Sequence, residues 1–192
     1  MKGLEIIRNG CEPVRIGAEY GLLLVMFNHI ERFGITDLHA CVTEYATGDR
    51  YRYASESIKE GDVYEIRYTE FDSASEPIKL DKKGERPVTR RESQEYEAPD
   101  YPLMEIDYNG LTVLKGWELE LNGKTVCGAL AGGGSGIIID SKNEFLQVSF
   151  SGTPAEGTMC KWFYSELKPG DVLKIRFDEF LVEALATPVK IF

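Results

Sequence analysis

The chain has 192 residues, of which 43% are hydrophobic and 28% charged, and its formal net charge is −10. This length predicts one or two domains, and the apolar fraction is sufficient for a folded core. The acidic balance argues against binding to nucleic acid or to an anionic membrane surface, because both require basic patches.

The sequence also argues against a membrane-embedded or exported protein. It contains no run of eighteen apolar residues, so no transmembrane helix is expected. Glu5 and Arg8 interrupt the apolar patch near the N-terminus, which is unlike a signal peptide. We therefore expect a cytoplasmic protein.

The first eighty residues are typical of a series of short strands. Asn9-Gly10 predicts a hairpin turn, because a type I′ turn needs positive φ at two successive residues. Residues 38–45 are expected to form a strand. Residues 19–34 fit either a long strand or a short helix, because short apolar runs are compatible with both.

Residues 58–71, IKEGDVYEIRYTEF, combine a turn signal with a clear strand pattern. Gly61-Asp62 favours a turn, since glycine tolerates positive φ and aspartate hydrogen-bonds to nearby backbone. Tyr64, Ile66 and Tyr68 then alternate with polar residues. Alternation with a period of two predicts a strand with one buried face.

Residues 81–100 differ in composition from the rest of the chain. The stretch DKKGERPVTRRESQEYEAPD is dominated by charged residues. Such a segment buries too little apolar surface to offset the entropy lost on ordering. We predict a linker or a long exposed loop there.

The second half again reads as strands. Asn122-Gly123 in residues 117–130 and the run at 144–152 predict a hairpin and a further strand, and Asn109-Gly110 is another turn signal. The glycine-rich residues 131–136, AGGGSG, lack the Gly-Lys-Ser/Thr ending of a P-loop and match no dinucleotide fingerprint. We expect a mobile connection between strands there, with ligand contact as the less favoured alternative.

The two halves share one phrase. Residues 167–180, LKPGDVLKIRFDEF, match residues 58–71 at an offset of 109, with eight of fourteen positions identical. Shorter similarities occur in the same order, including LEIIRNG at 4–10 with MEIDYNG at 104–110 and the Pro77 and Pro188 segments, which suit strand starts or sheet edges. Such order indicates an internal repeat.

The repeat predicts a mainly β fold made of two tandem homologous units, sandwich- or barrel-like. The units are residues 1–80 and 101–192, joined by the linker at 81–100. We expect the two units to pack about a pseudo-twofold axis, so that each covers apolar surface that the other would expose.

No sequence motif for catalysis or metal binding is evident. The four cysteines form no C-x-x-C pair, and we expect them to be reduced and mostly buried. The two histidines, His29 and His39, both lie in the first half and are expected at the surface or the edge of the core. We therefore predict no catalytic residue, no metal and no cofactor.

Two charged pairs recur in both copies of the phrase, namely Arg67 with Arg176 and Glu70 with Glu179. We interpret them as structural, forming cross-strand or inter-repeat ion pairs that fix the strand register. A carboxylate pair of the glycosidase type is the less favoured alternative, because no other feature supports it.

Aromatic residues are the remaining candidates for binding. YRY at 51–53 and WFY at 162–164 alternate, so some of their rings would point outward. An exposed platform for a sugar or a protein would comprise Trp117, Trp162, Tyr164, Tyr51 and Tyr53. Cross-strand packing of the same rings is the more favoured alternative.

The phrase K-x-G-D-x-x-x-I-R-[FY]-x-E-F, followed by a Pro-[IV]-Lys strand, resembles a segment of small uncharacterised bacterial proteins that carry it once. The resemblance covers about twenty-five residues in each half. It implies no activity and no site residue.

We expect a non-enzymatic scaffold that binds a basic protein partner, because the chain is acidic and lacks catalytic motifs. An immunity- or antitoxin-like role fits its size and charge. The alternative is a β module that binds a glycan or a small ligand, and a third hypothesis is a hydrolase whose site the sequence does not reveal.

Overall fold

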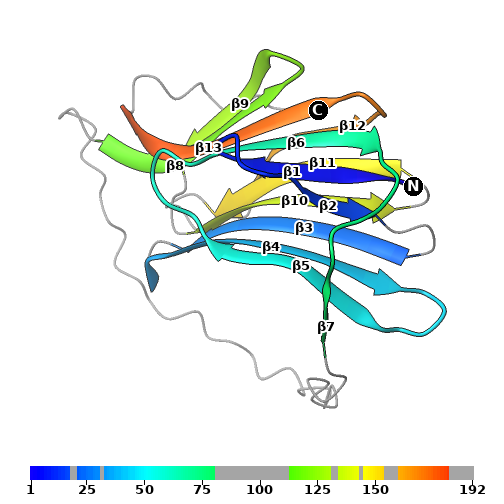
Figure 1. The fold of residues 1–192 in the computed structure, drawn as a ribbon. Coiled ribbons are helices and arrows are strands. Elements are labelled where there is room, and N and C mark those ends of the chain that lie inside the picture. The colour runs from blue at the N-terminus through cyan, green and yellow to red at the C-terminus, as the bar shows by residue number, and fades with distance from the viewer. Residues whose placement is uncertain are drawn as a thin grey trace.

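The computed structural model describes residues 1–17, 21–30, 33–80, 113–130, 134–142, 145–153 and 160–181. The fold is mainly β and consists of two antiparallel sheets that form the two layers of a sandwich (Figure 1). The predicted linker at 81–100 and the segment at 104–110 lie outside the described residues. Among those that are described, no helix has the length and apolar character needed to cross a membrane.

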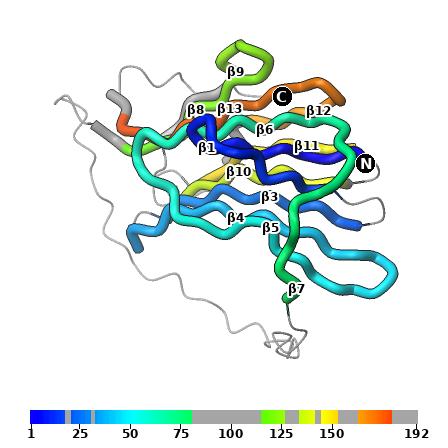
Figure 2. The backbone as a smooth tube through the Cα atoms, in the orientation of Figure 1, coloured from blue at the N-terminus to red at the C-terminus, as the bar shows by residue number. Residues whose placement is uncertain are grey.

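Each sheet contains strands from both halves of the chain. The six-stranded sheet has the order β2 (Val14–Gly17), β1 (Lys2–Arg8), β6 (Val63–Glu70), β13 (Val172–Leu181), β8 (Val113–Leu121) and β9 (Lys124–Leu130). The seven-stranded sheet has the order β12 (Cys160–Leu167), β11 (Phe145–Thr153), β10 (Gly134–Lys142), β3 (Gly21–Ile30), β4 (Ile35–Glu44), β5 (Arg50–Ser57) and β7 (Ile78–Leu80). The chain trace therefore repeatedly places distant segments side by side, such as β1 beside β6 (Figure 2).

The predicted turns and strands are found where the described residues cover them. Asn122 and Gly123 have φ values of 52° and 78° and close the β8–β9 hairpin. The ambiguous segment contains the strand β3, in which Leu23, Val25 and Phe27 are buried at alternate positions. A strand is favoured there because its alternating apolar side chains form one continuous face that packs into the core.

The core lies between the sheets and is shared by both halves. In the repeated phrase, Tyr64 and Ile66 face inward in the first copy, and Leu173 and Ile175 do so in the second. These residues belong to one cluster of buried side chains that spans both sheets. The predicted buried face of the repeated strand is therefore confirmed.

Part of the predicted glycine-rich connection is a strand instead. Gly134, Ser135 and Gly136 begin β10, where they pair with β11 and where Ser135 and Gly136 also pair with β3. A Cβ at Gly136 would lie 3.4 Å from both the Asn28 side chain and the Phe27 carbonyl. The side chain of a larger residue there would thus begin in van der Waals contact with β3.

The Gly-Asp turn of the first half is tied to the Asn-Gly turn after β1. The Asp62 carboxylate accepts hydrogen bonds from the Lys59 amide and from Asn9 Nδ2, both at 2.7 Å. The Val63 amide donates to Asn9 Oδ1 at 2.9 Å. Gly61 has a φ of 82°, a conformation that glycine adopts without strain.

The second half contains the same arrangement. The Asp171 carboxylate accepts hydrogen bonds from the Lys168 amide at 2.7 Å and from Asn122 Nδ2 at 2.8 Å. The Val172 amide donates to Asn122 Oδ1 at 2.9 Å. Each Asn-Gly turn is thereby fixed to the start of the central strand that pairs with it, β6 in the first half and β13 in the second.

The first network has an additional charged partner. Arg8 donates to Asp62 Oδ2 at 2.6 Å and to Glu56 Oε2 at 2.8 Å. Burial alone would raise the pKa of Asp62, but hydrogen bonds from the Lys59 amide, Asn9 and Arg8 together lower its pKa below the usual value. The Arg8 pKa is raised, chiefly by its hydrogen bond to Asp62.

We expect Asp62→Ala to destabilise the protein more than the matched Asp171→Ala. Asp62 is 6% exposed and bonds to Arg8 as well as to the turn, whereas the hydrogen bonds of Asp171 are to its turn partners. Losses of about 2–4 and about 1–2 kcal/mol are expected, respectively, since each hydrogen bond contributes about 1 kcal/mol and those to charged groups more. Urea unfolding measures both, and equal losses would contradict the role of Arg8.

The lowered pKa of Asp62 also fixes the direction of a pH effect. Its contribution to stability is fully present above the unfolded-state value of about 3.9 and is lost as the pH falls through the folded-state pKa. The difference in unfolding free energy between wild type and Asp62→Ala should therefore shrink below about pH 4. A difference that stays constant down to the acid transition would contradict this.

Candidate functional site

A cleft of about 420 Å³ opens between the sheets at one end of the sandwich. It lies where β3 ends, β4 begins and the turn between β5 and β6 passes, opposite β8 and β13. Its lining combines apolar, polar and charged side chains: His29, Gly34, Thr36, Ile58, Lys59, Glu60, Lys115 and Phe177. This volume falls within the usual range for small-ligand sites.

His29 stands at the inner end of the cleft. It follows Leu23, Val25 and Phe27 on the buried face of β3 and is itself only 4% exposed. Its Nδ1 lies 2.8 Å from Thr36 Oγ1, on the opposing residue of β4. The hydrogen bond holds the imidazole in a fixed orientation at the border between core and cleft.

The opposite wall is aromatic. The Phe177 ring lies 5.0 Å from the His29 ring, between ring centres, and 4.7 Å from the Trp117 ring. Trp117 Nε1 in turn donates to Ser135 Oγ at 2.9 Å, which joins the two sheets through the core. Phe177 and Ile58 thus supply the apolar part of the lining, and Phe177 is held against the buried Trp117.

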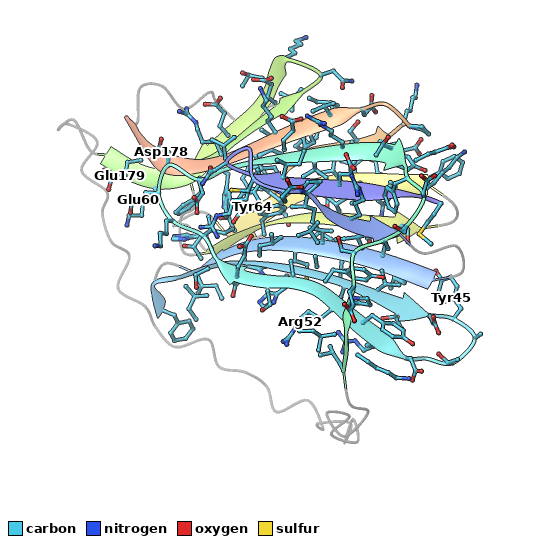
Figure 3. All side chains as sticks on the ribbon, viewed as in Figure 1. Tyr45, Arg52, Glu60, Tyr64, Asp178 and Glu179 are labelled. Atoms are coloured by element: carbon cyan, nitrogen blue, oxygen red, sulfur yellow. The ribbon has the colours of Figure 1, made fainter. Side chains whose placement is uncertain are left out.

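Charged side chains surround the mouth. Lys115, from β8, forms an ion pair with Glu60, which lies in the turn after β5. Lys59 precedes Glu60 and also lines the cleft. Figure 3 shows Glu60, Asp178 and Glu179 at this same end of the molecule. A ligand entering here would pass between ammonium and carboxylate groups before reaching the rings.

The structure does not bring the predicted aromatic platform together. Trp117 is fully buried, with 0% exposure, so it cannot contribute to an exposed surface. Burial follows from the alternation of W-E-L-E-L at 117–121, which places Trp117 on the same inward face as Leu119. The prediction for Trp117 is therefore wrong.

The other predicted aromatic residues differ in exposure. Tyr164 is 43% exposed on β12 and donates to Gln147 Oε1 at 2.9 Å. The ammonium group of Lys79 lies over the Tyr51 ring, 5.7 Å from the centre of that ring. Tyr53 packs against the core. The Trp162 side chain lies outside the described residues. Among the members of this set whose side chains are described, Tyr164 is the exposed one.

Arg67 and Arg176 each form an ion pair with a glutamate of the same sheet. Arg176 donates to Glu118 Oε2 at 2.8 Å across β13 and β8, and Arg67 pairs with Glu65 on its own strand. These contacts lie on the outer face of the six-stranded sheet.

The repeated glutamates lie near the ends of their strands. Glu70 Oε1 lies 3.6 Å from Lys2 Nζ across β6 and β1. Glu179 stands opposite Lys115 in the register of β13 and β8. Their strands β6 and β13 pair antiparallel, with Val172 opposite Arg67 and Arg176 opposite Val63. Glu70 and Glu179 therefore lie at opposite ends of this strand pair and do not form a glycosidase-type carboxylate pair.

Two of the four cysteines are described with their side chains, and both are free thiols. Cys11 is exposed in the turn after β1, and Cys41 is buried on β4. The Cys127 and Cys160 side chains lie outside the described part of the structure. The expected burial therefore holds for Cys41 and fails for Cys11, because the turn lies outside the core.

Sequence reasoning missed the cleft because its parts come from five separate segments. His29 carried a readable signal, since it continues the buried alternation of β3. Lys115 and Glu60 carried none, because charged residues are common and only the pairing of sheets places them together.

Comparisons with protein-family models, with curated proteins and with solved structures return no match to this chain. The candidate site therefore stands on its own geometry.

Proposed function

We propose that the protein is a binding module for a small polar ligand, held in the cleft at the end of the sandwich. The observation that carries this proposal is the buried His29, which bonds to Thr36 and contacts the Phe177 ring in a cleft with charged groups at its mouth. Pockets that combine an apolar floor with a few oriented polar groups are the usual form of small-molecule sites.

The lining indicates the kind of ligand. Rings and Ile58 offer apolar contact, Thr36 and His29 offer hydrogen bonds, and two lysines face one glutamate. Lys115 is paired with Glu60, and Lys59 is the second lysine of the lining. The proposed ligand is a small organic acid or a sugar acid, whose carboxylate would bind Lys59 and whose remaining atoms would contact Ile58 and Phe177.

A thermal-shift screen of small organic acids and acidic sugars tests the proposal. A ligand should raise the melting temperature of the wild type, because binding to the folded state stabilises it. Lys115→Ala and Thr36→Val should lose most of the shift, and the matched surface variant Tyr164→Ala should keep it. A shift that Tyr164→Ala abolishes and Lys115→Ala retains would place the ligand on the exposed aromatic residues instead.

Protein binding is the second proposal, and the outer face of the seven-stranded sheet supports it. Leu22, Leu24 and Met26 face outward on β3 and are partly exposed, and Ile138 stands beside Met26 on β10. An apolar centre with a polar rim is the usual composition of an interface. The net charge of −10 favours a basic partner in the cytoplasm, with an immunity- or antitoxin-like role as one form of this function.

The outer face of the six-stranded sheet is less suited to a basic partner. Its acidic side chains are matched across strands by basic ones, as in Glu5 with Arg15 and Glu120 with Lys174. The wild type should capture a basic protein from a lysate, and Met26→Asp should lose that protein. This result would support an interface on the outer face of β3. Capture that Met26→Asp leaves unchanged would contradict it.

We further propose that the chain contains two copies of one β unit, related by a pseudo-twofold axis. The sheet orders support this, because β2-β1-β6 is followed by β13-β8-β9, and β10-β11-β12 lies beside β3-β4-β5. The two matched Asn-Asp turn networks support it as well. In this arrangement β8 corresponds to β1, so residues 117–123 rather than 104–110 correspond to LEIIRNG.

A further inference from the structure

A second group of reactive side chains lies on the outer face of the seven-stranded sheet, away from the cleft. Ser55 Oγ lies 3.2 Å from His39 Nδ1, and His39 Nε2 lies 3.2 Å from Asp37 Oδ2. Asn28 Nδ2 donates to the other oxygen of Asp37 at 3.1 Å. The group therefore forms one chain of hydrogen bonds across β3, β4 and β5.

The ring nitrogens have a consistent set of roles in this chain. With the proton on Nε2, His39 donates to the Asp37 carboxylate and its Nδ1 accepts from the Ser55 hydroxyl. A serine next to a base that is oriented by a carboxylate is the arrangement that activates a nucleophile. Such a triad is recognised by geometry and roles rather than by its order in the sequence.

A β-bulge shapes the surface beside Ser55. His39 stands opposite Ser55, and Cys41 stands opposite Arg52, so β5 carries one extra residue between these pairs. Without the bulge, Arg52 and Ser55 would point to opposite faces of the sheet. Because of it, both project from the outer face, where Ser55 stands opposite His39 and Arg52 opposite Cys41.

A shallow depression of about 310 Å³ adjoins Ser55. It is lined by Arg52, Tyr53, Ala54, Ser55 and Ile78. Ile78 is 60% exposed on the edge strand β7, so it offers apolar contact to a ligand without moving. The depression thus joins a hydroxyl, a guanidinium and an apolar wall.

We propose that this face hydrolyses small carboxylic esters, with Ser55 as nucleophile, His39 as general base and Arg52 as the group that stabilises the oxyanion. Asp37 is a positioning residue that holds the imidazole, and Asn28 holds Asp37. Ile78 contacts the acyl or alcohol part of the ester. This activity is independent of ligand binding in the cleft.

The reaction balances without any further group. Ser55 Oγ attacks the carbonyl carbon while His39 Nδ1 takes the hydroxyl proton, and the carbonyl electron pair moves to the oxygen near Arg52. The oxyanion collapses, the bond to the alcohol breaks, and the alcohol leaves with the proton from His39. Water then attacks the acyl-serine in the same way, releasing the carboxylic acid and restoring Ser55.

Two probes test the proposal on the full chain. A fluorophosphonate should label the wild type on Ser55, located by mass spectrometry, and p-nitrophenyl acetate should be hydrolysed. Ser55→Ala should abolish the labelling, and His39→Ala should lower its rate constant at least about 100-fold, the usual effect of losing a general base. Ser57→Ala, on the same strand and face, should react like the wild type.

Each alternative result would overturn the proposal. An unlabelled wild type, or a label on another residue, would show that the hydrogen-bonded group is only structural. Ester hydrolysis unchanged by Ser55→Ala would show that a surface imidazole acts alone. Ser55, His39 and Ser57 all lie on the outer face, so circular dichroism of their variants should match the wild type.

The role of Asp37 has its own readout. Asp37→Asn should lower kcat for p-nitrophenyl acetate at least about tenfold and leave KM unchanged, because the carboxylate orients the base and does not touch the ester. Unchanged kcat would remove Asp37 from the proposed site.

Discussion

Ile66→Asp should prevent folding or lower the free energy of unfolding by at least about 4 kcal/mol. Ile66 is 1% exposed on β6, and an aspartate there would bury a charge with no partner. The equivalent Ile175→Asp on β13 should have a similar effect, because that position is also fully buried. Equilibrium unfolding in urea, or the yield of soluble protein, measures both.

The neighbouring residue supplies the control. Arg67 follows Ile66 and projects from the outer face, so Arg67→Asp should change stability by only about 0.5 kcal/mol. The two substitutions introduce the same side chain one position apart. If Arg67→Asp proved the more damaging of the two, the inward and outward faces of β6 would have to be exchanged.

Trp117→Ala is expected to cost about 3–5 kcal/mol. The substitution removes the largest fully buried side chain among the described residues and leaves a cavity beside Phe27 and Phe177. It also leaves Ser135 Oγ without the indole donor that reaches it across the sandwich. The melting temperature and the urea midpoint should both fall.

A milder variant separates these contributions. Trp117→Phe keeps an aromatic ring but removes the donor to Ser135, so a smaller loss of about 1–2 kcal/mol is expected from the hydrogen bond. Tyr164→Ala, at an exposed ring, should stay within about 0.5 kcal/mol of the wild type. A Trp117→Ala variant as stable as Tyr164→Ala would refute the buried position of the indole.

The strands were predictable where the signal is local. The alternation around Ile66 and Ile175 and the Asn122-Gly123 turn depend on neighbouring residues only, so the sequence displays them directly. The same alternation also shows that Trp117 faces inward with Leu119. Its assignment to an exposed platform ignored that pattern.

The two candidate sites could not be predicted from the pattern of neighbouring residues in the sequence. The cleft requires knowing that β8 and β13 face the ends of β3 and β4, a property of how the sheets stack. The contact between His39 and Ser55 depends on the register of β4 with β5, and the outward position of Arg52 depends on a one-residue bulge. No single segment of the sequence carries that information.

The two central strand pairs determine how the molecule unfolds. β6 pairs with β13, and β3 pairs with β10, so each sheet is joined across the halves at its centre. Removing either half would expose two long edges of unpaired backbone and one side of the shared core. We therefore expect the two halves to unfold together in one cooperative transition.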